Sequence, residues 1–444
     1  MPHWKVIFRK GKEMSQSKVK SNAKWIILCK IAQSLLQLVV GMLSARYLGP
    51  SNYGLINYAS SIVAFAMPLM QLGLIATLVN EFIDSPESEG KIMGTSLVLE
   101  LVSSVACIIC VGGFVSVFNY GETQTIVVCI LYSLSLFFKA LELFSYWFQY
   151  KLKSKYPSIV MLLAYVIVSV YRIYILMSGK SIYWFAVVNS VDFGIVGIAL
   201  LVIYHKCGGQ KLSFSFEIAK KLLHRSKYYI MSYMMVTIFQ NTDHIMLKKM
   251  SGDVENGYYT AAITCACVFG FVYTAIIDSM RPVILTAKKE KSENYEKRLS
   301  MLYCITSYMG IAQSIVFSVF SSLIVYILYG AEYMAAAPVL AVLIFYTSFA
   351  YMGSVRNIWI LAEGKQAILW KINLAGAAAN VVLNFILIPF FGAVGAAAAS
   401  LITQIFINFI LGFIIPALRE NNRILMQGLD VRMLLTSVKA VLKK

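Results

Sequence analysis

Long hydrophobic stretches alternate with short polar segments along nearly the whole chain, and this alternation predicts transmembrane helices. Each stretch is long enough to cross a hydrocarbon core of about 30 Å as an α-helix. The twelve stretches cover residues 25–48, 53–79, 92–118, 125–148, 158–176, 182–204, 228–247, 258–280, 299–328, 336–361, 368–390 and 393–418. The predicted fold is therefore an all-α polytopic membrane protein with about twelve transmembrane helices.

Positive charge is distributed unevenly between the two sets of loops. An even number of spans leaves both termini on one side of the membrane, and the loops and tails on that side carry 31 of the 39 Lys and Arg residues. The other side carries Arg46, Lys180, Lys248 and Lys249. Loops rich in Lys and Arg remain in the cytoplasm. We therefore expect both termini to be cytoplasmic.

A polar segment near the middle of the chain separates six spans from the next six. It mixes apolar residues such as Leu222 with cations such as Lys221 and Arg225, a pattern typical of a short helix on the membrane surface. The predicted organisation is a basic tail (1–24), a six-helix lobe (25–204), an amphipathic linker (205–227), a second six-helix lobe (228–418) and a second basic tail (419–444).

Two extracellular turns, one in each predicted lobe, resemble each other. A cation and two glycines recur at a constant offset along the chain: Arg46, Gly49 and Gly54 in the first turn, and Lys249, Gly252 and Gly257 in the second. Because each lobe has six spans, both lobes enter the membrane from the same side, which predicts a parallel repeat. The alternative is that any tight hairpin favours glycine.

Composition narrows the possible functions. Hydrophobic residues make up 59% of the chain. The net charge of +18 is spread over loops and tails, as topology and anionic lipids require, so we do not expect a nucleic-acid partner.

Most of the eight cysteines lie inside spans, and the four histidines share no ligand spacing. No nucleotide-binding motif of the GxxxxGK[ST] type is present. We therefore expect neither a metal nor a cofactor.

Four motifs occur in a recognisable order. They are RYLGPSNYGLINYA (46–59), YWFQ (146–149), NTDHIMLKKMSGDVENGYYTAA (241–262) and LNFILIPFFGAVGAAAASLI (383–402). Together they resemble the polysaccharide-transporter family of the multidrug/oligosaccharidyl-lipid/polysaccharide exporter superfamily. The resemblance covers essentially the whole chain. In this family an acidic residue often stands at the position of Asp243, whereas His244 replaces a residue that is usually Arg.

The resemblance implies a flippase in the bacterial cytoplasmic membrane, without enzymatic activity. Its cargo would be an undecaprenyl-diphosphate-linked oligosaccharide repeat unit, moved by alternating access for O-antigen or capsule assembly. Partners would be membrane lipids and the polymerase and glycosyltransferases of the same pathway, and the chain would act as a monomer.

Cations within the predicted spans are the first candidates for cargo binding. Charged residues inside a membrane are costly and usually face the bundle interior, and a diphosphate cargo needs positive charge there. The candidates are Lys30, Lys139, Arg172 and Arg356, with Arg46 at the outer mouth. Arg356 is the preferred candidate because small polar residues surround it. Lys139 has Glu142 three residues away on one helical face, which also predicts a local ion pair.

Three acids lie deepest in the predicted spans and are candidates for ion coupling. They are Asp243, Glu100 and Asp192, and Asp243 is the preferred one. For Asp243, the alternative is a structural carboxylate bonded within the bundle.

Two other functions stay open at this stage. A cation-coupled drug exporter of the same superfamily would favour an acidic, aromatic cavity, whereas deep Lys and Arg favour an anionic cargo. A membrane glycosyltransferase, polymerase or ligase would need a sizeable outer loop. The predicted outer loops, such as 119–124 and 177–181, are short, so an enzyme is disfavoured.

Overall fold

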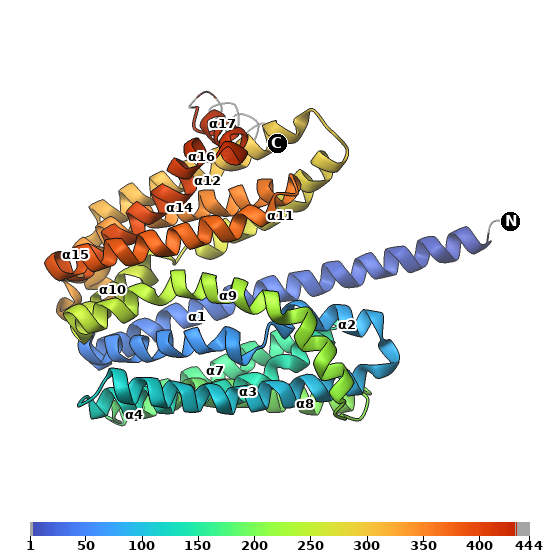
Figure 1. The fold of residues 1–444 in the computed structure, drawn as a ribbon, viewed down its shortest axis with the longest axis horizontal. Helices are drawn as coiled ribbons and strands as arrows, with labels where there is room; N and C mark the ends of the chain where they lie inside the picture. Colours follow the sequence, from blue (N-terminus) through green and yellow to red (C-terminus); the bar gives the residue numbers. More distant parts are fainter. Residues whose placement is uncertain (1–2, 431, 433–444) are drawn as a thin grey trace. The chain divides into compact units, whose positions relative to one another are not determined.

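The computed structural model describes the backbone of residues 3–430 and 432, and the side chains of residues 32–33, 36–231, 233–430 and 432. These residues form helices joined by short turns, and the described part of the chain contains no β-strand. Figure 1 shows the helices with their labels. The predicted all-helical polytopic fold is confirmed, and the chain is a multi-pass membrane protein.

The predicted spans can be followed along these helices. Eight helical stretches in the described part of the chain are long and apolar enough to cross a membrane, and the bent pair α10 and α11 makes a ninth. Two of the eight, Leu36–Met70 and Gln366–Ile414, each contain two predicted spans joined at a bend. The remaining predicted span, 228–247, lies in α9, where polar residues such as Asn241 and Asp243 lower the hydropathy. The twelve predicted spans therefore all correspond to helical segments.

The helices fall into two compact units. The first comprises residues up to Tyr47 and Ala59–Thr237, and the second comprises Leu48–Tyr58 and the residues from Ile238 onward. Helices α1 (His3–Met70) and α9 (Phe216–Ser251) contribute residues to both units.

The first unit packs around a core rich in aromatic side chains. Its other elements are η1 (Leu74–Ala76), α2 (Leu78–Asp84), η2 (Pro86–Ser88), α3 (Glu89–Phe118), α4 (Thr123–Ser133), α5 (Ser135–Lys139), η3 (Ala140–Leu143), α6 (Phe144–Tyr150), α7 (Lys155–Met177) and α8 (Ile182–Lys206). Phe82, Trp147 and Tyr204 are almost completely buried in this core. Aromatic side chains remove large apolar areas from exposure, so they stabilise the helix contacts strongly.

The second unit has its own core. Its elements are α10 (Asp253–Ala266), α11 (Gly270–Lys289), α12 (Asn294–Val319), α13 (Ser321–Tyr329), η4 (Ala331–Tyr333), α14 (Ala336–Ala362), η5 (Gln366–Ile368), α15 (Leu369–Ile405), the π-helix η6 (Phe406–Ile410), α16 (Leu411–Ile414), η7 (Pro416–Leu418) and α17 (Arg419–Gly428). Tyr273, Leu299 and Trp359 are buried where α11, α12 and α14 pack together.

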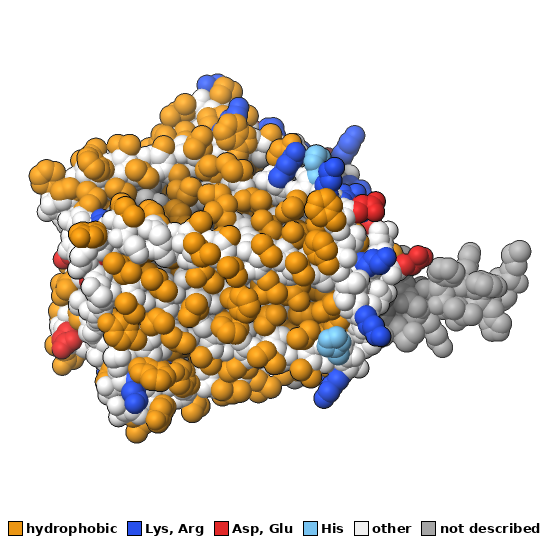
Figure 2. Space-filling model, turned by 60° about the horizontal axis from the view of Figure 1, so that its bottom comes forward, with side chains coloured by type: hydrophobic (Ala, Val, Ile, Leu, Met, Phe, Trp, Pro, Cys, Tyr) orange, Lys and Arg blue, Asp and Glu red, His pale blue; other side chains and the backbone are white. Residues whose placement is uncertain are grey.

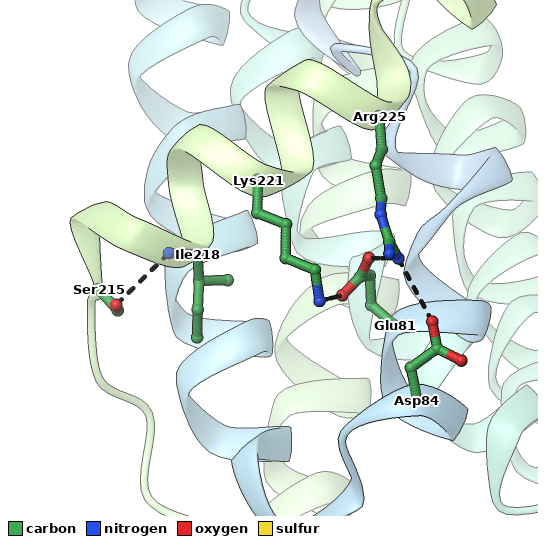
Figure 3. A network of polar contacts seen from close by, with 6 residues as sticks. All are labelled: Glu81, Asp84, Ser215, Ile218, Lys221 and Arg225. Carbon is green, nitrogen blue, oxygen red and sulfur yellow. Dashed lines mark hydrogen bonds and ion pairs between the residues drawn. The ribbon is translucent and has the colours of Figure 1, made fainter.

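The linker between the predicted lobes is held by ion pairs within the first unit. Glu81 of α2 is 2% exposed and accepts a hydrogen bond from Lys221 Nζ at 2.6 Å and another from Arg225, which also contacts Asp84 at 3.3 Å (Figure 3). Leu222 on the same helix is fully buried. The predicted short linker helix is thus the first part of α9, which continues without interruption to Ser251.

The side chains on the outer surface are largely apolar. Figure 2 shows hydrophobic side chains over most of the visible surface, with few charged side chains among them. On α3, Val102, Ile109 and Val117 are between 66% and 81% exposed, and on α15 Phe385 and Phe390 are 70% and 79% exposed. Exposed apolar surface of this extent is typical of helices that face lipid.

The two glycine turns noted in the sequence have similar backbone conformations. Gly49 bends α1 with φ 69° and ψ 169°, and Gly252 precedes α10 with φ 93° and ψ 178°. Positive φ at both positions explains why glycine recurs there. Within the second unit the turn residues touch: Asn256 donates a hydrogen bond from Nδ2 to the Gly54 carbonyl at 2.8 Å. The equivalent glycines, Gly54 and Gly257, therefore meet at one close contact.

We predict that Gly54→Ala destabilises this contact. A methyl group on Gly54 would lie 2.7 Å from the Gly257 nitrogen and closer still to the Asp253 carbonyl oxygen. Because these are backbone atoms, they cannot move aside cheaply, and the expected loss is about 1–3 kcal/mol. Thermal unfolding of the purified protein in detergent measures the effect. Gly113→Ala is the control, since nothing lies within 4 Å of that site. Equal unfolding temperatures for the two variants would contradict the prediction.

Candidate functional site

A buried carboxylate with three hydrogen-bond donors lies inside the second unit. Asp243 of α9 is 4% exposed. Tyr259 of α10 donates to Oδ2 at 2.6 Å, Ser400 of α15 donates to Oδ2 at 2.5 Å, and Asn384 of α15 donates to Oδ1 at 2.5 Å. Helices far apart in the sequence therefore converge on one acid, and their side chains supply hydrogen bonds to both of its oxygens.

Amide side chains extend this arrangement along α15. Asn380 and Asn384 are four residues apart on one helical face, and Asn384 Nδ2 donates to Asn380 Oδ1 at 3.1 Å. Asn380 also contacts Ser400 at 3.5 Å, and Asn384 Oδ1 is buried without a hydrogen-bond partner. We call Asp243, Tyr259, Asn380, Asn384 and Ser400 the Asp243 network. Its carboxylate, hydroxyl and amide oxygens are suited to a proton or a small monovalent cation.

His244 bonds to an amide side chain, and Asp243 acts on it electrostatically. Its Nδ1 lies 2.7 Å from Asn256 Oδ1, and its ring meets the Tyr259 ring edge-on at 5.2 Å. His244 therefore links the Asp243 network to the glycine turn, because Asn256 also bonds the Gly54 carbonyl.

Arg356 is enclosed in the second unit and is 5% exposed. Its Nη1 donates to the Ile407 carbonyl at 2.7 Å and to Asn408 Oδ1 at 2.9 Å, while Nη2 donates to Asn357 Oδ1 at 3.3 Å. The π-helix that contains Ile407 is the kind of irregularity that often marks a functional site. All of these partners are neutral oxygens, and within the described part of the chain no carboxylate pairs with Arg356. Its positive charge is thus uncompensated.

The other predicted site residues in the first unit form a mixed-charge cluster. Lys139 and Glu142 make the expected ion pair at 2.6 Å. Arg172 Nη2 donates to Asn189 Oδ1 at 3.3 Å and interacts electrostatically with Asp192. Asp192 is also within electrostatic range of Lys139 and Glu142.

Three further predicted site residues belong to the first unit. Glu100 of α3 is 2% exposed and within electrostatic range of Lys139 and Glu142. Arg46 is exposed on α1. The side chain of Lys30 lies outside the described residues.

The structure thus divides the predicted site residues between the units. Lys139, Arg172, Glu100 and Asp192 come together in the first unit, and Asp243 and Arg356 belong to the second. Sequence reasoning did not select Tyr259 and Ser400. Two features of the sequence could have indicated them. Tyr259 lies in the motif GYYTAA, and Ser400 is the polar residue that ends a run of small apolar residues. Among the described side chains (residues 32–33, 36–231, 233–430 and 432), no group of three or more His, Cys, Asp or Glu residues could hold a metal ion.

Comparison with solved structures identifies the class of this fold. A lipid II flippase MurJ in an inward closed conformation aligns with a TM-score of 0.69 and 17% identity, covering 93% of each chain. An inward-facing multidrug resistance MATE family transporter of the MOP superfamily aligns with a TM-score of 0.67 and 15% identity, covering 90% of this chain and 96% of that one. The chain therefore has the fold of MOP-superfamily transporters.

Sequence comparison identifies the family. Residues 19–288 match the model of a family described as polysaccharide biosynthesis protein, and the chain belongs to this family. The capsular polysaccharide biosynthesis protein CapF of Staphylococcus aureus is 22% identical over 391 residues, or 86% of this chain and 96% of CapF. An uncharacterized membrane protein of Methanocaldococcus jannaschii is 26% identical over 239 residues, which span 51% of this chain and 46% of that protein.

Proposed function

We propose that this protein is a flippase for undecaprenyl-diphosphate-linked oligosaccharide repeat units. It moves them across the bacterial cytoplasmic membrane by alternating access and supplies O-antigen or capsule assembly. Membership of the polysaccharide biosynthesis family and similarity to CapF over nearly the whole of both chains support the sugar pathway. The fold shared with a lipid II flippase supports the transport of a lipid-linked cargo.

The observation that carries the proposal is the uncompensated charge of Arg356. Moving an ionised diphosphate into hydrocarbon costs tens of kcal/mol, so a flippase must supply positive charge along the route. The oxygens bonded to the Arg356 guanidinium are neutral, so they do not cancel its positive electrostatic field. This field acts over a longer distance in a medium of low dielectric. An exporter of cationic drugs would gain nothing from such a charge. Lys30, Arg46, Lys139 and Arg172 are proposed to add to the attraction of the cargo.

The topology follows from the distribution of charge. The basic tails and the linker that holds Lys221 and Arg225 are proposed to lie in the cytoplasm, where the lipid-linked precursor is assembled. The chain is proposed to act as a monomer beside the glycosyltransferases and the polymerase of its pathway. It catalyses no covalent step in this scheme.

Asp243 is proposed to be the ion-responsive group of the second unit. Its carboxylate is buried with hydroxyl and amide groups from α10 and α15, so a proton or Na⁺ that binds there changes the charge at a point where three helices meet. Neutralising that charge alters the hydrogen bonds that join these helices, which couples ion binding to helix movement.

We predict that Arg356→Ala lowers surface polysaccharide about tenfold or more, since a hydrogen bond to a charged group contributes about 1.5–3 kcal/mol. Arg356→Lys should recover part of the activity because it keeps the charge but loses the fork geometry. The assay is complementation of a strain that lacks the gene, with membrane abundance measured in parallel. Arg281→Ala is the control, since Arg281 is half exposed and pairs with Asp278. Full complementation by Arg356→Ala at normal abundance would refute the cargo-binding role.

We predict that Asp243→Asn reduces export and weakens its dependence on pH and Na⁺. The substitution preserves the shape of the side chain and removes its charge, so it tests the charge alone. Reconstituted protein is assayed over a range of pH and of Na⁺ concentration, with Asp278→Asn as a half-exposed acidic control from the same unit. Wild-type export with an unchanged pH and Na⁺ dependence would exclude Asp243 from coupling.

A further inference from the structure

Glu100 is a buried acid for which the described part of the chain provides no hydrogen-bond donor. The residue is 2% exposed in α3, and Oε1 has no hydrogen-bond partner. Among the described residues, no hydrogen bond or ion pair to this carboxyl group is formed. This distinguishes Glu100 from Asp243, whose carboxylate accepts three hydrogen bonds. A buried acid without donors is rare in folded proteins and requires an explanation.

The cation that could neutralise Glu100 is already bound elsewhere. Helix α3 packs against α5 and η3, which bring Lys139 and Glu142 within electrostatic range of Glu100. Lys139 Nζ, however, lies 2.6 Å from Glu142 Oε2 and 4.4 Å from the centre of the Phe193 ring. One ammonium group therefore stands near two carboxyl groups and pairs with one of them.

Other polar groups in this region are unpartnered as well. Ser96 precedes Glu100 by one turn on the same face of α3, and Ser135 precedes Lys139 by one turn on α5. The hydroxyl oxygens of both serines are buried without a hydrogen-bond partner. Unpartnered buried hydroxyls thus lie one turn from both Glu100 and Lys139, and others occur at Tyr165, Ser190 and Ser226 of the same unit.

The remaining titratable groups on neighbouring elements do not supply a counter-charge. Tyr146 of α6 is within electrostatic range of Glu100, and Asp192 of α8 acts on Lys139 and Glu142. On α4, Cys129 is buried and Tyr132 bonds Ser60 and Asn189. On α2 and η2, Glu81 is held by Lys221 and Arg225, Asp84 contacts Arg225, and Glu87 is exposed.

We propose that Glu100 is a proton-binding site and that Lys139 moves between Glu142 and Glu100 as the proton leaves and returns. An unpartnered carboxylate is far costlier to bury than an uncharged carboxyl group, so Glu100 is protonated in the arrangement seen here. When its O–H bond breaks, the proton passes to water and the carboxylate attracts the Lys139 ammonium. Glu100, Lys139 and Glu142 then share one positive and two negative charges.

A proton suits this site better than a metal ion does. The Lys139 ammonium repels a second cation, whereas it stabilises the carboxylate that remains when a proton leaves. Ca²⁺ or Mg²⁺ would also need about six oxygen ligands. Among the described side chains, no group of three or more His, Cys, Asp or Glu residues is suited to a metal.

The proton changes the charge of the first unit by one. A nearby anionic diphosphate would therefore make the proton bind more tightly, and by linkage the proton would favour the cargo to the same extent. This coupling between the proton and the cargo rests on the proposed flippase function. The protonation of Glu100 itself does not depend on that function.

The test is the infrared signature of the carboxyl group. Full-length protein in liposomes is titrated with acid and alkali, and difference spectra report the C=O stretch of a protonated, buried carboxylic acid. We expect E100Q, which keeps the shape of the side chain, to abolish this band. E87Q, which alters an exposed acid of the same unit, should leave it unchanged. Folding of each variant is checked by thermal unfolding.

Two further variants test the role of Lys139. K139Q removes the cation, so the midpoint of the titration should rise by about one pH unit or more. E142Q frees Lys139 for Glu100 and should lower the midpoint. A difference spectrum that E100Q leaves unchanged, or midpoints that do not move in opposite directions, would overturn the proposal. Because no cargo is present, these outcomes are independent of whether the protein is a flippase.

Discussion

Hydrocarbon offers no hydrogen bonds, and this constraint governs the whole molecule. Each backbone amide must find its partner within its own segment, so the chain folds almost entirely into helices. Their outward faces can then be apolar, as Ile109 and Phe385 illustrate. Departures from regular helix occur where another group satisfies the backbone, as in the π-helix whose Ile407 carbonyl is bonded by Arg356.

The same constraint explains how the buried charges are treated. Glu81 is neutralised by two cations from the linker, and Asp243 is stabilised by three donors from other helices. Arg356 is bonded to amide oxygens, and Glu100 finds no hydrogen-bond donor among the described residues. The first two arrangements join helices. The last two underlie the proposed roles: attraction of an anionic cargo by Arg356 and proton binding by Glu100.

The helices were predictable from the sequence because hydrophobic length and positive loops follow directly from the membrane. The glycine turns were also predictable, since Gly49 and Gly252 both require positive φ. The residues that bond to the buried charged side chains could not be predicted from the sequence. Tyr259 and Ser400 reach Asp243 only through helix packing, and a carboxyl group without a partner looks the same in sequence as one with three. The continuity of α9 through the linker was likewise hidden, because its polar residues resemble a break.

Membrane potential offers the most direct test of an anionic cargo. Two negative charges that leave a negative interior gain about 4–5 kcal/mol per 100 mV, enough to shift the equilibrium more than a thousandfold. The measurement is flipping of labelled undecaprenyl-diphosphate-linked oligosaccharide in liposomes under an imposed K⁺ diffusion potential, without ATP. A flippase for this cargo should flip faster toward the positive side and slow when the sign is reversed. Flipping that is indifferent to the sign and size of the potential would contradict charge-driven export.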